Sequence, residues 1–65
     1  MENKQMICNL LCEALKATRD QADLLSITYD SYLETATLEY GSGHRTINVA
    51  CDSGIAMMRD ILRGC

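Results

Sequence analysis

The chain has 65 residues and a net charge of −3, with no proline, tryptophan or phenylalanine and four cysteines. This length allows a single domain, which buries only about 60% of the surface of its unfolded chain, so oligomerisation is an attractive further source of stability. Its six basic residues are scattered and form no stripe, which argues against binding to nucleic acids or to anionic membranes.

A helix is expected at residues 3–19, where Ala, Leu, Glu and Lys dominate and apolar residues recur at helical spacing. The stripe comprises Met6, Ile7, Leu10, Leu11, Ala14 and Leu15, and Cys8 and Cys12 widen it. A stripe of this width is predicted either to cover a sheet alone or to touch both a sheet and a second subunit.

Three strands are expected next, at residues 24–29, 33–40 and 45–51, because apolar and polar side chains alternate there. Turn residues at 29–32 and 41–44 separate these strands. The side chains expected to share one side of each strand are Leu25, Ile27 and Tyr29, then Ala36, Leu38 and Tyr40, then Ile47, Val49 and Cys51.

A last helix is expected at residues 53–63, with Gly64 as its stop. Its apolar positions are Ile55, Met58, Ile61 and Leu62. The order α-β-β-β-α has only short connections and predicts a two-layer α+β fold, in which both helices cover one face of a three-stranded antiparallel meander.

The start of this last helix is a candidate anion site, because free N–H groups and a glycine come directly after a strand. The proposed ligand-binding residues are His44, Arg45, Asp52, Ser53 and Gly54. The alternative is that Asp52 or Ser53 only caps the helix and that nothing binds there. Arg45 and Gly54 lie at opposite ends of the third strand, about 25 Å apart at ~3.3 Å per residue, so only an antiparallel contact between subunits would unite them.

The sheet face away from the helices is a second candidate site, for a protein partner. It is expected to be rich in hydroxyl groups and nearly uncharged, and an exposed tyrosine in the first turn offers an anchor. The proposed contact residues are Tyr32, Thr35, Thr37, Thr46 and Asn48. A merely solvated sheet face is the alternative.

No catalytic or cofactor-binding motif stands out. His44 lies in a glycine-flanked turn and is expected to be exposed, and no spacing singles out a nucleophile for it. Cys8 and Cys12 are one helical turn apart, but only one histidine is available to complete a metal site, so they are expected to be core residues. No signal peptide or membrane span is recognisable, which predicts an intracellular, cytoplasmic protein.

Residues 29–36 and 48–61 resemble small uncharacterised proteins carried by phages and mobile elements of Gram-positive bacteria. The resemblance implies an accessory protein expressed inside a bacterial host, and such proteins often counter host defences by binding. The expected function is therefore that of a non-enzymatic homo-oligomer that sequesters a nucleotide signal molecule. The alternative is an inhibitor or adaptor that binds a host protein.

Overall fold

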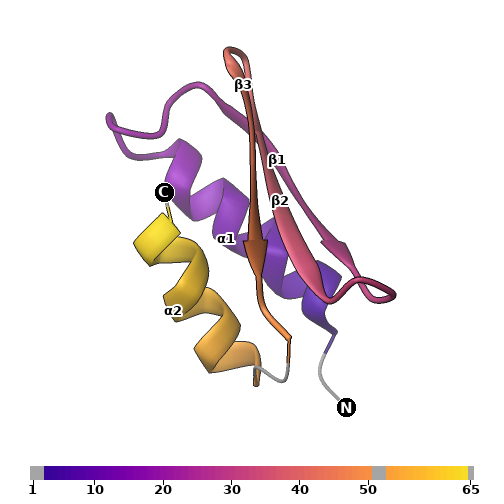
Figure 1. The fold of residues 1–65 in the computed structure, drawn as a ribbon. Coiled ribbons are helices and arrows are strands. Elements are labelled where there is room, and N and C mark those ends of the chain that lie inside the picture. Colours follow the sequence, from indigo (N-terminus) through magenta and orange to yellow (C-terminus); the bar gives the residue numbers. More distant parts are fainter. Residues whose placement is uncertain (1–2, 51–52, 65) are drawn as a thin grey trace.

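The computed structural model describes residues 3–50 and 53–64 and contains two helices on one face of an antiparallel sheet (Figure 1). The strands lie side by side in sequence order, β1-β2-β3. The elements are α1 (Lys4–Lys16), β1 (Leu24–Asp30), β2 (Thr35–Tyr40), β3 (Gly43–Asn48) and α2 (Gly54–Gly64). This confirms the predicted α+β fold and the order of its elements.

Helix α1 begins and ends through side-chain hydrogen bonds of its flanking residues. The Asn3 side chain accepts from the backbone N–H of Met6 at 3.0 Å, which satisfies one of the free donors of the first turn. At the other end, both the backbone N–H and the hydroxyl of Thr18 donate to the Leu15 carbonyl, at 3.0 and 2.7 Å. These bonds replace helical ones, and the helix stops at Lys16 instead of reaching residue 19 as predicted.

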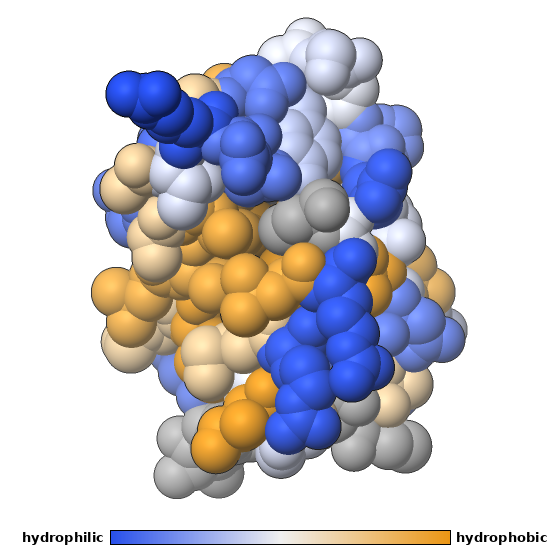
Figure 2. Space-filling view, turned by 90° about the vertical axis from the view of Figure 1, so that its left-hand side faces the viewer, coloured by the Kyte–Doolittle hydropathy of each residue, from blue (hydrophilic) through white to orange (hydrophobic). Residues whose placement is uncertain are grey.

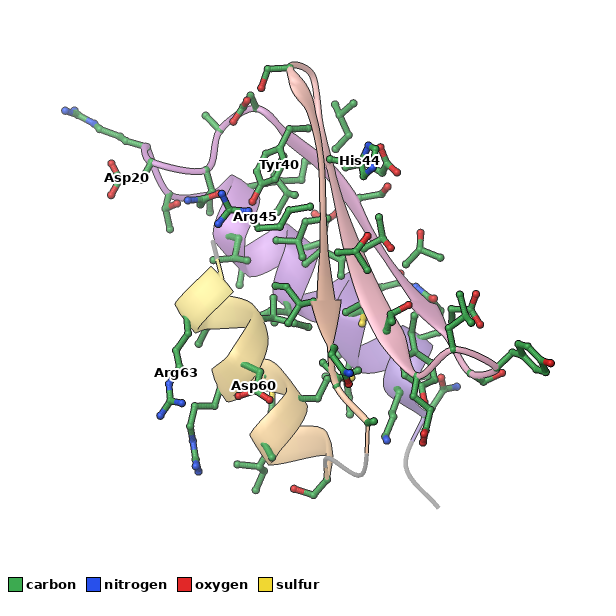
Figure 3. The ribbon with its side chains drawn as sticks, in the orientation of Figure 1. Asp20, Tyr40, His44, Arg45, Asp60 and Arg63 are labelled. Carbon is green, nitrogen blue, oxygen red and sulfur yellow. The ribbon has the colours of Figure 1, made fainter. Side chains whose placement is uncertain are left out.

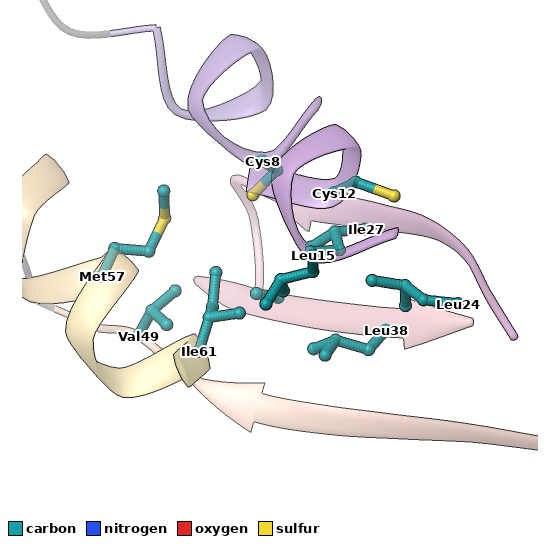
Figure 4. Packing of buried hydrophobic residues seen from close by; sticks show 10 residues of the cluster. Cys8, Cys12, Leu15, Leu24, Ile27, Leu38, Val49, Met57 and Ile61 are labelled. Atoms are coloured by element: carbon teal, nitrogen blue, oxygen red, sulfur yellow. The ribbon is translucent and has the colours of Figure 1, made fainter. Parts of the chain in front are cut away.

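The core lies between the two helices and the sheet (Figure 4). Helix α1 contributes two small side chains, Cys8 and Cys12, and one larger one, Leu15. The buried residues are Cys8, Cys12, Leu15, Leu24, Ile27, Ala36, Leu38, Val49, Met57 and Ile61.

Both helices are rotated relative to the apolar stripes predicted for them. Met6 and Leu10 of α1 are 56% and 66% exposed, and Ile55 and Leu62 of α2 are 68% and 52% exposed. Helices resting on a sheet of only three strands bury a narrow line of residues each. The outer part of each stripe therefore remains at the surface.

A β-bulge corrects the prediction for the first strand. Leu24 pairs with Tyr40 while Ser26 pairs with Glu39, so Leu25 is the extra residue. An inserted residue reverses the side to which the preceding side chain points. Leu24 is consequently buried and Leu25 is 61% exposed, the opposite of the predicted alternation.

Both hairpin turns lie close to their predicted places. The first falls at residues 31–34, where the Asp30 carboxylate accepts from the backbone N–H groups of Tyr32 and Leu33 at 2.8 and 3.0 Å. The second needs only Gly41 and Ser42, because Gly43 already pairs with Tyr40. The φ of Gly43 is +152°, a backbone conformation that glycine adopts most readily.

The third strand ends earlier than predicted. β3 stops at Asn48, whose side chain accepts from the N–H of Ala50 at 2.8 Å. Val49 is buried, as expected, although it lies just beyond the strand. Cys51, which was predicted to complete the apolar side of this strand, lies outside the described residues.

The outer edge of β1 is covered by one side chain of α1. The Gln5 amide donates to the carbonyl of Ile27 at 3.1 Å and accepts from the N–H of Tyr29 at 2.8 Å. A neighbouring strand would bond these two backbone groups in the same way. Gln5 therefore satisfies part of an edge that would otherwise attract another strand.

Replacing Gln5 tests whether its side chain protects the outer edge of β1. In Gln5→Ala both edge bonds are lost, and we expect unfolding to become easier by about 1 kcal/mol. The Tyr29 amide should exchange its hydrogen faster, as measured by NMR. Gln5→Glu is the matched control, because it keeps an acceptor for Tyr29 but loses the donor to Ile27. Equal Tyr29 exchange in the parent and in Gln5→Ala would contradict the proposed cover.

Candidate functional site

The two ligand-binding residues proposed on β3 point to opposite faces of the sheet. His44 pairs with Glu39 and Arg45 pairs with Leu38, and successive side chains of a strand alternate. Figure 3 shows Arg45 and Tyr40 on the helix side and His44 on the other. The Arg45 guanidinium donates to the carbonyl of Gly64, where a cation interacts favourably with the helix C-terminus.

Two of the other proposed ligand-binding residues, Ser53 and Gly54, lie at the start of α2. The Ser53 hydroxyl accepts from the N–H of Ala56 at 3.2 Å, and the Ser53 carbonyl accepts from Met57 at 2.8 Å. Ser53 thus caps the helix, and Gly54 is buried, while Asp52 lies outside the described residues.

The two parts of the proposed anion site are therefore separated by the length of α2. This helix has 11 residues and spans about 16 Å at a rise of ~1.5 Å per residue. Arg45 contacts its last residue and Ser53 precedes its first. A single chain does not unite these groups, in line with the expectation that only a contact between subunits would do so.

His44 and Arg45 do border one shared depression at the hairpin end of the sheet. Its volume is about 400 Å³, and it is wide open to solvent. Two carboxylates from the loop after α1 take part in the lining, which disfavours a purely anionic ligand. The lining residues are Asp20, Gln21, Asp23, Tyr40, Ser42, Gly43, His44 and Arg45.

The sheet face away from the helices carries the predicted array of polar side chains. The strand register aligns them in three rows across β1, β2 and β3. In the middle row the hydroxyls of Thr37 and Thr46 are 3.3 Å apart. The rows are Ser26, Glu39 and His44, then Thr28, Thr37 and Thr46, then Asp30, Thr35 and Asn48.

Tyr32 does not belong to this array. It lies in the first turn and is 91% exposed, beyond the end of the strands. Of the predicted contact residues, the structure therefore gathers Thr35, Thr37, Thr46 and Asn48 on one surface and leaves Tyr32 to one side.

The outer surface of the two helices is a third candidate, which the sequence did not predict as a separate site. Figure 2 shows apolar residues gathered across this surface, beside strongly hydrophilic ones. We call it the helical face, defined by the apolar residues that the two helices leave at the surface: exposed Met6, Leu10, Ile55 and Leu62 with partly buried Ile7, Leu11 and Met58. Leu10 also lines a depression of about 230 Å³ between α1 and β1, together with Leu25 and Ser26. Arg59 and Arg63 are exposed on α2. On the helix surface they lie next to Ile55 and Leu62, at one side of the apolar residues. The unusual width of the α1 stripe was the available signal.

The remaining chemistry-bearing residues form no site within residues 3–50 and 53–64. No group of three His, Cys, Asp or Glu side chains is placed there to hold a metal ion. Cys8 and Cys12 are free thiols in the core, as expected for packing residues. No helix in this part of the chain is long and apolar enough to cross a bilayer.

Comparison with known proteins finds no relative: no family model matches the chain, and no curated sequence or solved structure is significantly similar to it. The function therefore has to be inferred from the surfaces of the chain itself.

The buried thiol of Cys8 gives a pH-dependent test of the core. Burial raises its pKa above the usual 9.0, so the folded state favours the protonated thiol. This contribution is fully present below the pKa of the unfolded chain and is lost as pH rises through the folded pKa. The free energy of unfolding of the parent minus that of Cys8→Ala should decrease above about pH 9, by at most ~1.4 kcal/mol per pH unit. Denaturant unfolding of both proteins from neutral to alkaline pH measures this, and a constant difference would contradict it.

Proposed function

We propose that this chain is a non-catalytic, self-associating binding protein whose helical face receives a partner protein. The observation that carries the proposal is the exposure of Leu10 and Leu62, 66% and 52%, on neighbouring helices of so small a protein. Contiguous exposed apolar surface in a soluble protein commonly marks an interaction site. Burying one leucine side chain stabilises a complex by about 1.5–3 kcal/mol before the costs of association.

The chemistry of the partner follows from the edge of the helical face. Arg59 and Arg63 lie one helical turn apart on the exposed side of α2, next to its apolar residues. Arginine at the rim of an apolar surface favours an acidic neighbour. The partner that fits best presents apolar side chains flanked by carboxylates.

The helical face is a better candidate for the partner than the hydroxyl-rich sheet face. Threonine and asparagine side chains there remain well hydrated when free, so covering them gains little unless every hydrogen bond is replaced. Leu10 and Leu62 lose no hydrogen bond on burial. In the setting that the sequence resemblance implies, the partner is a protein of the bacterial host, and the effect is inhibition by occupancy.

The absence of catalysis in this proposal has a geometric basis. His44 is exposed on β3, and its cross-strand neighbour on β2 is the carboxylate of Glu39. Within the part of the chain that the structure describes, no hydrogen bond joins His44 to a serine, threonine or cysteine. A histidine acting as general base needs its nucleophile within about 3 Å.

Introducing negative charge on the helical face tests the proposal. Leu10→Asp combined with Leu62→Asp should leave folding intact, because both side chains are largely exposed. Binding of a host protein captured from bacterial lysate should weaken at least tenfold per site, since a carboxylate replaces an apolar anchor. Isothermal titration with the purified partner measures the affinity.

Matched charges on the other side of the molecule provide the control. Thr28→Asp combined with Asn48→Asp adds the same charge at exposed positions of the open sheet face and should bind like the parent. If this control loses the partner while the helical variant keeps it, the sheet face is the binding surface and the assignment is wrong.

A nucleotide ligand is the second candidate, favoured by the shared depression at Arg45 and His44. Its weakness is the pair Asp20 and Asp23 in the same lining, which repels phosphate. A nucleotide or cyclic dinucleotide at 100 times its dissociation constant would stabilise the fold by about 2.7 kcal/mol. In a domain of this size that raises the melting temperature by more than about 10 °C.

The two parts of the proposed anion site, Arg45 on β3 and Ser53 at the start of α2, can be tested separately in this assay. Arg45→Ala should reduce the thermal shift, because it removes the guanidinium that would pair with phosphate. Ser53→Glu should leave the shift unchanged, because α2 holds Ser53 far from the depression. The absence of any shift across the nucleotide panel would exclude this candidate.

A further inference from the structure

The two edges of the sheet are treated differently by the rest of the chain. Gln5 bonds two outward backbone groups of β1, the carbonyl of Ile27 and the N–H of Tyr29. On β3 the outward groups can be identified from the pairing with β2. The N–H of Val49 donates inward to the Glu34 carbonyl at 3.0 Å. Because the backbone groups of a strand alternate in direction, those of His44, Thr46 and Asn48 point outward.

These outward groups have no partner in residues 3–50 and 53–64. No hydrogen bond within that part of the chain reaches the backbone of His44, Thr46 or Asn48 on the outer side. Every residue of β3 is exposed except Ile47, which is partly buried. An unpaired row of N–H and C=O groups is a template for another strand.

The usual protections of an edge strand are also missing from β3. Gly43–Asn48 contains no proline and no lysine, and its pairing with β2 runs without a bulge. Its single arginine, Arg45, is held on the helix side by Gly64 and does not guard the edge. The contrast with the covered β1 edge marks β3 as the edge at which a strand is added.

We propose that β3 of one copy pairs antiparallel with β3 of a second copy, about a two-fold axis at Thr46. The product is one continuous sheet, to which each copy contributes its three strands. This inference deepens the self-association in the proposed function, and it does not depend on which partner the helical face binds.

The sequence of β3 fits itself in this register. Thr46 lies opposite Thr46 of the other copy, and His44 lies opposite Asn48, so that each outward pair exchanges two backbone hydrogen bonds. On the helix side Arg45 lies opposite Ile47, and no like charges meet. Moving the axis to Arg45 would place two arginines directly opposite each other, which is unfavourable. A shift to an odd register would place the polar face of one copy beside the helix side of the other.

The self-complementarity of β3 selects the occupant of this edge. Arg45 contacts Gly64, so the last turn of α2 lies beside the part of β3 that carries the axis. In the Thr46 register the outward residues of one β3 strand meet polar residues of the other, and no like charges are opposed. An unrelated strand would not meet these conditions by construction, so the fit favours a second copy.

Substitutions at Thr46 test the pairing in the full-length chain. Sedimentation velocity and native mass spectrometry over a concentration series should show a dimer for the parent. Thr46→Lys places two like charges across the axis and should weaken the dimer about tenfold or more. Thr46→Pro removes the outward N–H without touching the bonds to β2 and should give a monomer. Thr37→Lys, on the same face of the central strand, is the matched control and should dimerise like the parent.

Cross-linking gives a second readout that does not depend on affinity. Directly opposed residues of a hydrogen-bonded antiparallel pair have Cα atoms about 5.5 Å apart, within the range of a disulfide. In a Cys65→Ser background, Thr46→Cys should oxidise to a covalent dimer. Thr28→Cys lies in the same row on the covered edge and should remain monomeric.

Three results would overturn the pairing. One is a parent that stays monomeric at every concentration, and another is a dimer that survives both Thr46→Pro and Thr46→Lys. The third is a dimer abolished by Leu10→Asp with Leu62→Asp and not by Thr46→Lys, which would assign self-association to the helical face. If Thr46→Pro fails to fold by circular dichroism, Thr46→Lys and the cross-link decide. Failure of partner binding alone leaves the dimer intact, so the two proposals can be told apart.

Discussion

Packing of two helices against one face of a three-stranded sheet is the contact on which the other features of this protein depend. It joins Cys8 and Leu15 of α1 and Met57 and Ile61 of α2 to the apolar side of the strands. A chain of this length can build one such interface and no more. Everything outside that interface is surface, including apolar residues for which the narrow sheet has no room.

This constraint explains why both helices carry exposed leucines and isoleucines. A helix that rests on a wide sheet can bury a broad stripe, whereas here each helix meets the strands along a narrow line. The surplus apolar residues form the helical face. Retaining them costs solubility, because exposed apolar surface promotes association, and the proposed role in binding would account for their presence.

The same constraint makes the edges of the sheet important. With only three strands, two of them are edge strands, and each leaves half of its backbone groups without a strand partner. One edge is partly satisfied by Gln5, whereas no hydrogen bond from residues 3–50 or 53–64 reaches the outer side of the other. Pairing of this open edge between copies would place the helical faces of both on the same side of one larger sheet, so self-association and partner binding would use separate surfaces.

The sequence by itself determined the number, type and order of the elements, because helical and strand periodicities are local and the turn residues between them are distinctive. It also gathered Thr35, Thr37, Thr46 and Asn48 correctly on one face, since a regular strand alternates. It misplaced Leu25, because a bulge is decided by pairing with β2 and not by local pattern. Only the tertiary structure decided which part of each apolar stripe is buried and that α2 separates Arg45 from Ser53. These outcomes depend on how the helices are rotated and placed on the sheet, which is set by contacts between residues far apart in the chain.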